Sequence, residues 1–252
     1  MKKTSLALAC LALLAAWQVL ALLVARPILP APWTVAQALV TGLQNDLGGH
    51  FLVSVWRVLA SMGLAVLTAA PAGLVLGQSA RINRLFSPLI YILYPIPKVV
   101  LVPVVLLFLG VGDLAKISII FIILFFQILV LVRDQAASLR PELVQSVRSL
   151  GAGRRALFRF VYLPATLPAI LTALRQSVGT AVAVLYVAES FATRQGLGYY
   201  IYINGSSLLN YPAMYAGIVM MSLLGLGLYF GVDWLEGRLC PWLKLGQNEA
   251  RR

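Results

Sequence analysis

The stretch ELVQSVRSLGAGRRALFRFVYLPATLP, Glu142–Pro168, is basic and polar, and long apolar segments flank it on both sides. Apolar residues recur within it at spacings of three and four, the period of one face of a helix. This pattern is interrupted at Gly151, where glycine favours a turn. The stretch is therefore predicted to form two short amphipathic helices joined by a bend at the membrane surface. The apolar positions are Leu143, Val147 and Leu150 before the bend, and Leu157, Phe160 and Val161 after it.

Two Leu-Pro pairs, Leu163-Pro164 and Leu167-Pro168, follow the second helical pattern. Proline has no amide hydrogen and clashes with the preceding turn of a helix. We therefore expect these pairs to end the second short helix.

Composition places the rest of the chain in a membrane. The chain has 252 residues, of which 61% are hydrophobic and 11% charged, and its mean hydropathy is +0.90. These values are typical of an integral membrane protein. Apolar runs of about 20 residues are long enough to cross a bilayer as helices. The predicted fold is all-α and polytopic, with about six transmembrane helices, at residues 5–25, 51–76, 88–109, 116–132, 169–187 and 213–235.

The first apolar run follows Met-Lys-Lys, so a secretory signal peptide is an alternative for it. Its length of about 20 residues exceeds the apolar core of a signal peptide, and Arg26-Pro27 makes a poor cleavage site. We interpret the run as a retained transmembrane helix. Residues 1–50 then comprise this helix and an external loop, with a short helix expected around residues 34–43.

The third apolar run contains Pro95, Pro97 and Pro103, with Lys98 among them. A helix in lipid tolerates such breaks where neighbouring helices or a water-filled cavity satisfy the freed carbonyl groups. This run is therefore predicted to line a cavity.

Basic residues are distributed unevenly between the two predicted faces. Cytoplasmic loops carry an excess of Lys and Arg, and this rule places both termini and the loop at residues 134–168 in the cytoplasm. The core domain then covers residues 51–236 and a cytoplasmic tail covers residues 237–252. The net charge of +12 is thus explained by topology and does not indicate nucleic acid. The basic residues on the cytoplasmic side are Lys2, Lys3, Arg81, Arg84, Arg133, Arg140, Arg148, Arg154, Arg155, Arg159, Arg238, Lys244, Arg251 and Arg252.

The spacing within the central stretch resembles the cytoplasmic coupling loop, or EAA loop, of bacterial ABC importer permeases. In that family a Glu-Ala-Ala triplet precedes a glycine, and an aliphatic residue and a Leu-Pro pair follow at fixed distances. Here Gly151, Val161 and Leu163-Pro164 occupy those positions. The triplet falls on Gln145-Ser146-Val147, so its own letters are absent.

The resemblance extends over most of the chain, to the permeases of the nitrate, sulfonate, taurine and bicarbonate branch. The segments that carry it are SVWRVLASMGLAV at 54–66, YPIPKVVLVPVVLLFLGVGDLAKI at 94–117, RSLGAGRRALFRFVYLPATLPAILTALR at 148–175, and VAES with GLGYYI at 187–201.

This resemblance implies a type I importer in a bacterial inner membrane. Its parts are two permease subunits, expected to be a homodimer, two cytoplasmic ATPase subunits, and an extracytoplasmic solute-binding protein. The residues implied to contact the ATPase are Gln145, Ser146, Val147, Leu150, Gly151, Leu163 and Pro164. ATP is used by the partner subunits, and this chain is expected to bind no cofactor and no metal. The implied solute is a small anion such as nitrate, a sulfonate, taurine or bicarbonate, with a thiamine-precursor-like molecule as the alternative.

Ionisable residues inside a membrane are costly and tend to be functional. We therefore consider Arg57, Lys98 and Glu189 as candidates for the translocation pathway. Arg57 could instead extend to the interface, and Glu189 could pair with Arg194 or cap a helix end. His50, the single histidine, is expected to lack a carboxylate partner at ligand spacing.

Two other classes compete with an importer subunit. A membrane enzyme needs a constellation of catalytic groups, and eight acidic residues with one histidine supply none at suitable spacing. The chain also lacks a GxxxxGK[ST] phosphate loop, so it is not expected to hydrolyse ATP itself. An ATP-independent channel or secondary transporter would have no use for the coupling loop.

Overall fold

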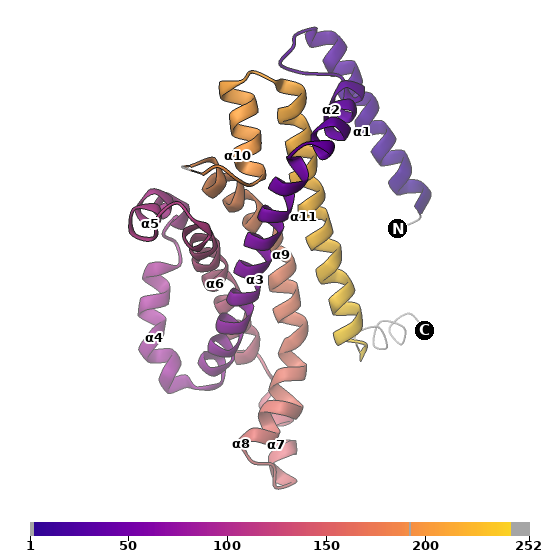
Figure 1. Cartoon of the computed structure of the whole chain (residues 1–252). Helices are drawn as coiled ribbons and strands as arrows, with labels where there is room; N and C mark the ends of the chain where they lie inside the picture. Colours follow the sequence, from indigo (N-terminus) through magenta and orange to yellow (C-terminus); the bar gives the residue numbers. More distant parts are fainter. Residues whose placement is uncertain (1–2, 192, 243–252) are drawn as a thin grey trace. The chain divides into compact units, whose positions relative to one another are not determined.

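The computed structural model describes residues 3–191 and 193–242, and within them it contains helices and no strands (Figure 1). These residues belong to two compact units, Met1–Trp56 with Tyr186–Leu223, and Arg57–Leu185 with Leu224–Arg252. Most of the predicted tail, residues 243–252, and Lys2 lie outside the described residues.

Among the residues that the structure describes, four helical runs are long and apolar enough to cross a membrane. The pair formed by α4 (Ala80–Leu93) and η1–α5 (Lys98–Leu101 and Val102–Leu109) passes the same test when it is taken as one broken span. The expected first span forms α1 (Lys3–Val24), whose apolar part Leu8–Val24 is shorter, and its crossing of the membrane stays a prediction. The four long runs are α3 (Leu47–Gln78), α6 (Asp113–Ala137), the run Arg155–Ser190 that contains α9 (Leu163–Ser190), and α11 (Tyr211–Leu239).

The proline-rich third run is broken as predicted, and its two parts are bent by 75°. Its first part begins earlier than expected, because residues 80–87, which precede the predicted span 88–109, belong to α4. The hydroxyl of Ser79 accepts a hydrogen bond from the amide of Ile82, 3.4 Å away, and this contact caps the start of the helix. Pro88 lies inside α4 and does not begin it.

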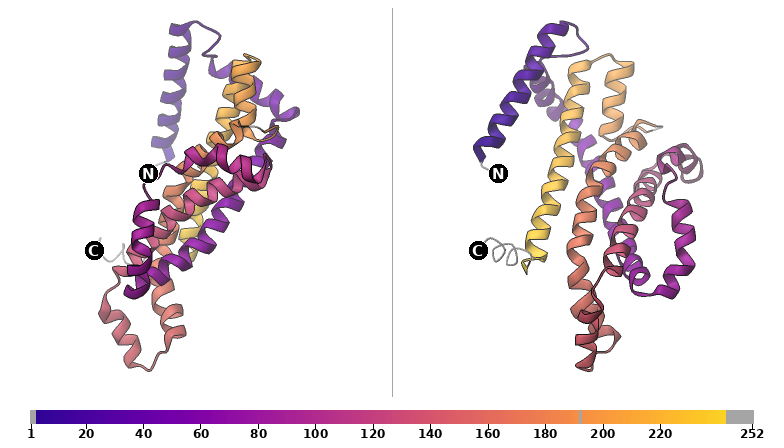
Figure 2. Two further views of the ribbon diagram at one scale, coloured as in Figure 1. Left: turned by 90° about the vertical axis from the view of Figure 1, so that its left-hand side faces the viewer. Right: turned by 180° about the vertical axis from the view of Figure 1, so that it is seen from behind.

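The predicted hairpin is present between α6 and α9. It consists of α7 (Pro141–Ser149), a bend, α8 (Arg154–Leu157) and a π-helical turn, η2 (Phe158–Tyr162). Gly151 has a φ angle of +81°, a left-handed conformation that glycine adopts without strain, so the predicted turn at this residue is confirmed. The hairpin projects beyond the ends of α6 and α9 (Figures 1 and 2).

The prediction that the Leu-Pro pairs end the second helix is wrong. Residues Arg155–Ser190 form one helical run of 36 residues, with Pro168 in its interior. The π-helical turn accounts for the continuity at Pro164, because the amide of Leu163 bonds to the carbonyl of Phe158, one residue further back than in an α-helix. The hydroxyl of Thr166 also donates to the carbonyl of Tyr162 at 2.7 Å, which supplies a further partner within this widened turn.

Small residues bring α3 and α6 close together. A Cβ atom at Gly73 would lie 2.8 Å from the carbonyl oxygen of Leu129. One at Gly77 would lie 2.5 Å from the Cβ of Ala136. Association of helices in lipid depends on such close backbone approach, since apolar burial gives little driving force there.

The unit formed by residues 1–56 and 186–223 contains the amino-terminal segments and the first part of α11. The short helix expected around residues 34–43 is α2 (Pro32–Gln44), with Pro32 in its first turn. Residues 197–207 form α10 (Leu197–Tyr202) and a π-helical turn, η3 (Ile203–Ser207). The ring of Trp17 on α1 lies 5.9 Å from that of Tyr215 on α11, centroid to centroid.

Candidate functional site

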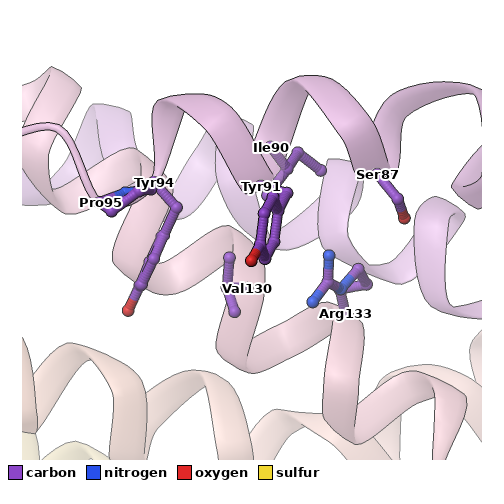
Figure 3. Close-up of a pocket in the computed structure, with 7 residues that line it drawn as sticks. All are labelled: Ser87, Ile90, Tyr91, Tyr94, Pro95, Val130 and Arg133. Carbon is purple, nitrogen blue, oxygen red and sulfur yellow. The ribbon is translucent and has the colours of Figure 1, made fainter.

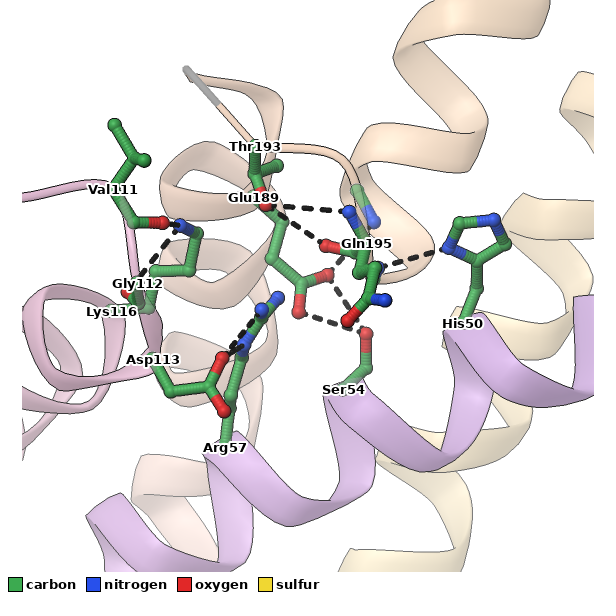
Figure 4. Close-up of polar contacts among 12 residues, drawn as sticks. His50, Ser54, Arg57, Val111, Gly112, Asp113, Lys116, Glu189, Thr193 and Gln195 are labelled. Carbon is green, nitrogen blue, oxygen red and sulfur yellow. Dashed lines mark hydrogen bonds and ion pairs between the residues drawn. The ribbon is translucent and has the colours of Figure 1, made fainter.

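The carboxylate of Glu189, at the end of α9, is completely buried and holds the start of α10. It accepts a hydrogen bond from the amide of Gly198 at 2.9 Å, and the Ser54 hydroxyl lies 2.9 and 2.8 Å from its two oxygens (Figure 4). The same hydroxyl accepts from the amide of Leu197 at 2.8 Å. A negative charge at the start of a helix is stabilised by free amides and by the helix dipole. Of the two alternatives for Glu189, the structure thus bears out the helix cap.

His50 binds the amide of Gly196, which comes directly before the amides of Leu197 and Gly198. Its Nδ1 accepts from Gly196 at 3.0 Å, and its Nε2 lies 3.0 Å from a carboxylate oxygen of Asp46. This arrangement fixes the neutral ring with its proton on Nε2. The prediction that His50 lacks a carboxylate partner is therefore wrong, because Asp46 lies one helical turn before it. Tyr199 and Tyr200 complete the surroundings, with ring centroids 5.8 and 5.5 Å from that of His50.

Arg57 is buried and paired with a carboxylate at the start of α6. Its side chain is only 3% exposed, and its Nε and one terminal nitrogen lie 2.9 and 2.7 Å from one oxygen of Asp113 (Figure 4). Asp113 is in the first turn of α6, where a carboxylate is favoured by the helix dipole. Lys116, at the start of the expected span 116–132, is buried and donates to the carbonyls of Val111 and Gly112. Arg57 and Lys116 therefore hold the start of α6 and the glycine turn before it.

Lys98 follows the break in the third run. Its ammonium donates to the carbonyls of Leu93, Tyr94 and Ile96, at 2.8, 3.0 and 3.3 Å. These carbonyls are left free because Pro95 and Pro97 interrupt the helix. A cation at a carboxyl-terminal helix end is also favoured by the dipole.

The residues predicted to contact an ATPase all lie in the hairpin or at the start of α9. Gln145, Ser146 and Gly151 are exposed, and Leu150 is 85% exposed at the tip. Phe160, on the turn that leads into α9, is 68% exposed. This end of the molecule thus presents apolar side chains to the outside, with arginines at 148, 155 and 159 beside them. Val147 is half-buried, as is Pro164, and Leu163 is 37% exposed.

Sequence reasoning missed Ser54 and Asp113 as the partners of Glu189 and Arg57. These pairs are 135 and 56 residues apart, so no local pattern connects them. Asp46 was detectable, because it precedes His50 by the four residues of one helical turn. In the part of the chain that the structure describes, no three His, Cys, Asp or Glu residues are placed to hold a metal ion.

Residues 63–240 match the model of the family described as binding-protein-dependent transport system inner membrane component. This match covers more than half of the chain and includes the hairpin. The chain belongs to this family of ABC importer permeases.

Characterised permeases show the same relationship. The chain is 30% identical over 233 residues to the taurine transport system permease protein TauC of Escherichia coli, a match covering 90% of this chain and 84% of TauC. It is 27% identical to the formylaminopyrimidine transport permease protein ThiX of Halalkalibacterium halodurans, over 93% of this chain and 94% of ThiX. The predicted family and its taurine and sulfonate branch are confirmed.

The fold of this permease is also that of a solved transporter. A chain of the MetNI methionine ABC transporter, in an inward-facing conformation, superposes with a TM-score of 0.67. The match covers 78% of this chain and 97% of the MetNI chain, at 19% identity. The predicted type I importer fold is therefore confirmed, and the chain is a multi-pass membrane permease of this class.

Proposed function

We propose that this permease imports a small organic anion, of the sulfonate or taurine class, and that the hairpin couples its movements to ATP hydrolysis on partner subunits. The 30% sequence identity with the taurine permease TauC supports a solute of the sulfonate or taurine class. The exposed hairpin supports the coupling, since its apolar tip is accessible to a partner protein. The alternative solute is a thiamine-precursor-like molecule, which the match to the formylaminopyrimidine permease favours.

The single observation that carries the coupling proposal is the form of the hairpin. Leu150, 85% exposed, stands next to a glycine in a left-handed conformation, so an apolar side chain is held out from the chain at a defined turn. A few residues that fill pockets of the partner carry most of the free energy of a protein interface, and a side chain held out in this way can reach such a pocket. The arginines beside it would favour an acidic rim on the partner. We assign ATPase contact to residues 145–151, with Leu163 and Pro164 joining this contact region to the long helix.

The proposed assembly contains two ATPase subunits, a second permease, expected to be a copy of this chain, and an extracytoplasmic solute-binding protein. Both termini and the hairpin are placed in the cytoplasm, because most Lys and Arg residues then lie on the side where the positive-inside rule expects them. Hydrolysis is assigned to the partners, since the sequence contains no phosphate loop.

The test is to tag the carboxyl terminus, extract the chain gently from native membranes and identify what co-purifies. We expect an ATP-binding-cassette subunit near one to one, and its loss in the variant Leu150→Asp. The matched control is Leu208→Asp, the same change at a residue that is 64% exposed and lies outside the predicted membrane spans. If the chain is recovered alone and solute flux does not depend on ATP, a channel or secondary transporter takes the place of the importer.

A further inference from the structure

A cavity of about 320 Å³ lies beside the broken third run, between residues 94–99 and the helices α6 and α9. Its lining is mainly apolar, with aromatic rings from Tyr94 and Phe126. Three polar side chains from three separate elements reach it, those of Lys98, Gln127 and Thr180. A mainly apolar cavity with a few converging polar groups is the usual form of a site for a small molecule.

The positive charge in this cavity is held at a fixed place. Three carbonyls at the end of α4 bind the Lys98 ammonium, which also lies 4.6 Å from the centroid of the Phe126 ring. These neutral partners orient the ammonium without cancelling its charge. The bond to Ile96 is the longest of the three, at 3.3 Å, so an anionic oxygen can replace it at the lowest cost.

Gln127 and Thr180 lie within helices long enough to span the membrane, α6 and the run that contains α9. Both side chains are half-buried, and neither makes a hydrogen bond to any other part of residues 3–191 and 193–242. A polar group inside the hydrocarbon region normally finds a partner, because leaving it unpaired is costly. An amide and a hydroxyl thus remain available as hydrogen-bond donors beside the ammonium.

A second cavity, of about 540 Å³, lies next to the first, between α4 and α6. Tyr94 lines both cavities, and Arg133 lines the second, near the end of α6 that leads to the hairpin. Figure 3 shows Arg133 on the side of this cavity near Tyr91 and Ser87, with Tyr94 at its other end. Each cavity therefore contains one basic side chain, and no acidic residue lines either one.

We propose that Lys98, Gln127 and Thr180 form a site within the permease that receives the sulfonate or carboxylate group of the solute during its passage. The ammonium attracts the acid group, the amide and the hydroxyl donate to its oxygens, and the rings of Tyr94 and Phe126 contact its short carbon chain. The anion then continues past Tyr94 into the cavity of Arg133. This inference rests on the proposed importer function and assigns part of the selectivity to the membrane subunit.

The test uses the full chain in membrane vesicles, and no ATPase is needed. Thr180→Cys is made in a chain whose own cysteines, Cys10 and Cys240, are replaced by serine. It is then labelled with two methanethiosulfonate reagents of similar size, one with a sulfonate and one with a trimethylammonium group. We expect the sulfonate reagent to react about tenfold faster, as a nearby fixed charge at an intermediate effective dielectric constant allows. Taurine in excess should slow the labelling.

The added change Lys98→Gln should remove the preference, and Arg84→Gln, the same change at an exposed arginine of α4, should retain it. Loss of Lys98 also leaves the carbonyls that it binds without a partner, so a second variant is needed. Gln127→Leu keeps the charge of Lys98. It should retain the preference for the sulfonate reagent and abolish the protection by taurine. Equal labelling by both reagents with Lys98 present would overturn the proposal. That outcome is distinguishable from failure of the importer function, which the co-purification of an ATPase decides separately.

Discussion

The hydroxyl of Ser54 lies within 2.9 Å of both carboxylate oxygens of Glu189 and also accepts the amide hydrogen of Leu197. All three residues are completely buried. One hydroxyl therefore connects α3, the end of α9 and the start of α10. This contact is the centre of a cap whose other members are His50 and Gly198.

Replacing Ser54 by alanine should destabilise the permease. The change leaves a buried amide and a buried carboxylate each without one partner, at a cost of about 1–3 kcal/mol. The measurement is thermal unfolding in detergent, where we expect the midpoint to fall by several degrees. Ser190→Ala is the control, since that hydroxyl only donates to Tyr186 within its own helix and is partly exposed. An equal effect of the two changes would contradict the connecting role of Ser54.

Glu189→Gln should impair transport while membrane insertion is retained. Glutamine still has an oxygen to accept the amide of Gly198, but it removes the negative charge at the start of α10. Uptake of taurine by the assembled transporter is the measurement, with the amount of inserted chain as the reference. Normal uptake would show that the charge is not needed.

Arg57 and Asp113 should show coupled effects on stability. Arg57→Met leaves Asp113 without its cation, and Asp113→Asn leaves a buried guanidinium with a weaker partner. Since Asp113 is 48% exposed, we expect a coupling free energy of about 1 kcal/mol, well below that of a fully buried pair. A double-mutant cycle on the unfolding midpoint measures it. Additive effects of the two single changes would show that the ion pair contributes nothing.

Gly151→Val should uncouple transport from ATP. A β-branched residue at a φ of +81° costs on the order of 1–3 kcal/mol, so the bend between α7 and α8 would change its conformation. ATP-dependent uptake should be lost while the chain remains inserted. Gly153→Val, two residues away and with open space around its Cβ position, is the matched control and should retain uptake. Loss in both variants would point to general damage to the hairpin.

Gly77→Ala should weaken the packing of α3 on α6, because the added methyl group meets Ala136 and the carbonyl of Arg133, each at 2.5 Å. Overpacking of this kind costs about 1–3 kcal/mol. Gly63→Ala, on the same helix with nothing within 4 Å, should be neutral or stabilising by about 0.5–1 kcal/mol. Unfolding in detergent compares the two. A stable Gly77→Ala variant would mean that the helices separate at little cost.

The sequence was sufficient for features that depend on neighbouring residues. The turn at Gly151 and the break near Pro95 and Pro97 follow from local backbone chemistry, and both are present. The prediction that the Leu-Pro pairs end the second short helix was wrong, because a π-helical turn before Pro164 keeps the helix continuous. No residue pattern in the sequence predicts such a turn. The partners of Glu189 and Arg57 could not be predicted from the sequence, for a different reason. They come from distant segments, and only the packing of helices brings them together.

The absence of a break between the hairpin and α9 has a mechanical consequence. The run Arg155–Ser190 contains 36 residues, so it is about 54 Å long at 1.5 Å per residue. It is continuous in its helical conformation from Arg155 to Ser190, through the π-helical turn and past Pro168. If this helix tilts as one rod, a rotation of about 5° moves its far end by roughly 5 Å over this length. A small tilt of one continuous helix would thus carry a displacement over a length greater than the thickness of a bilayer, with no helical hydrogen bond broken.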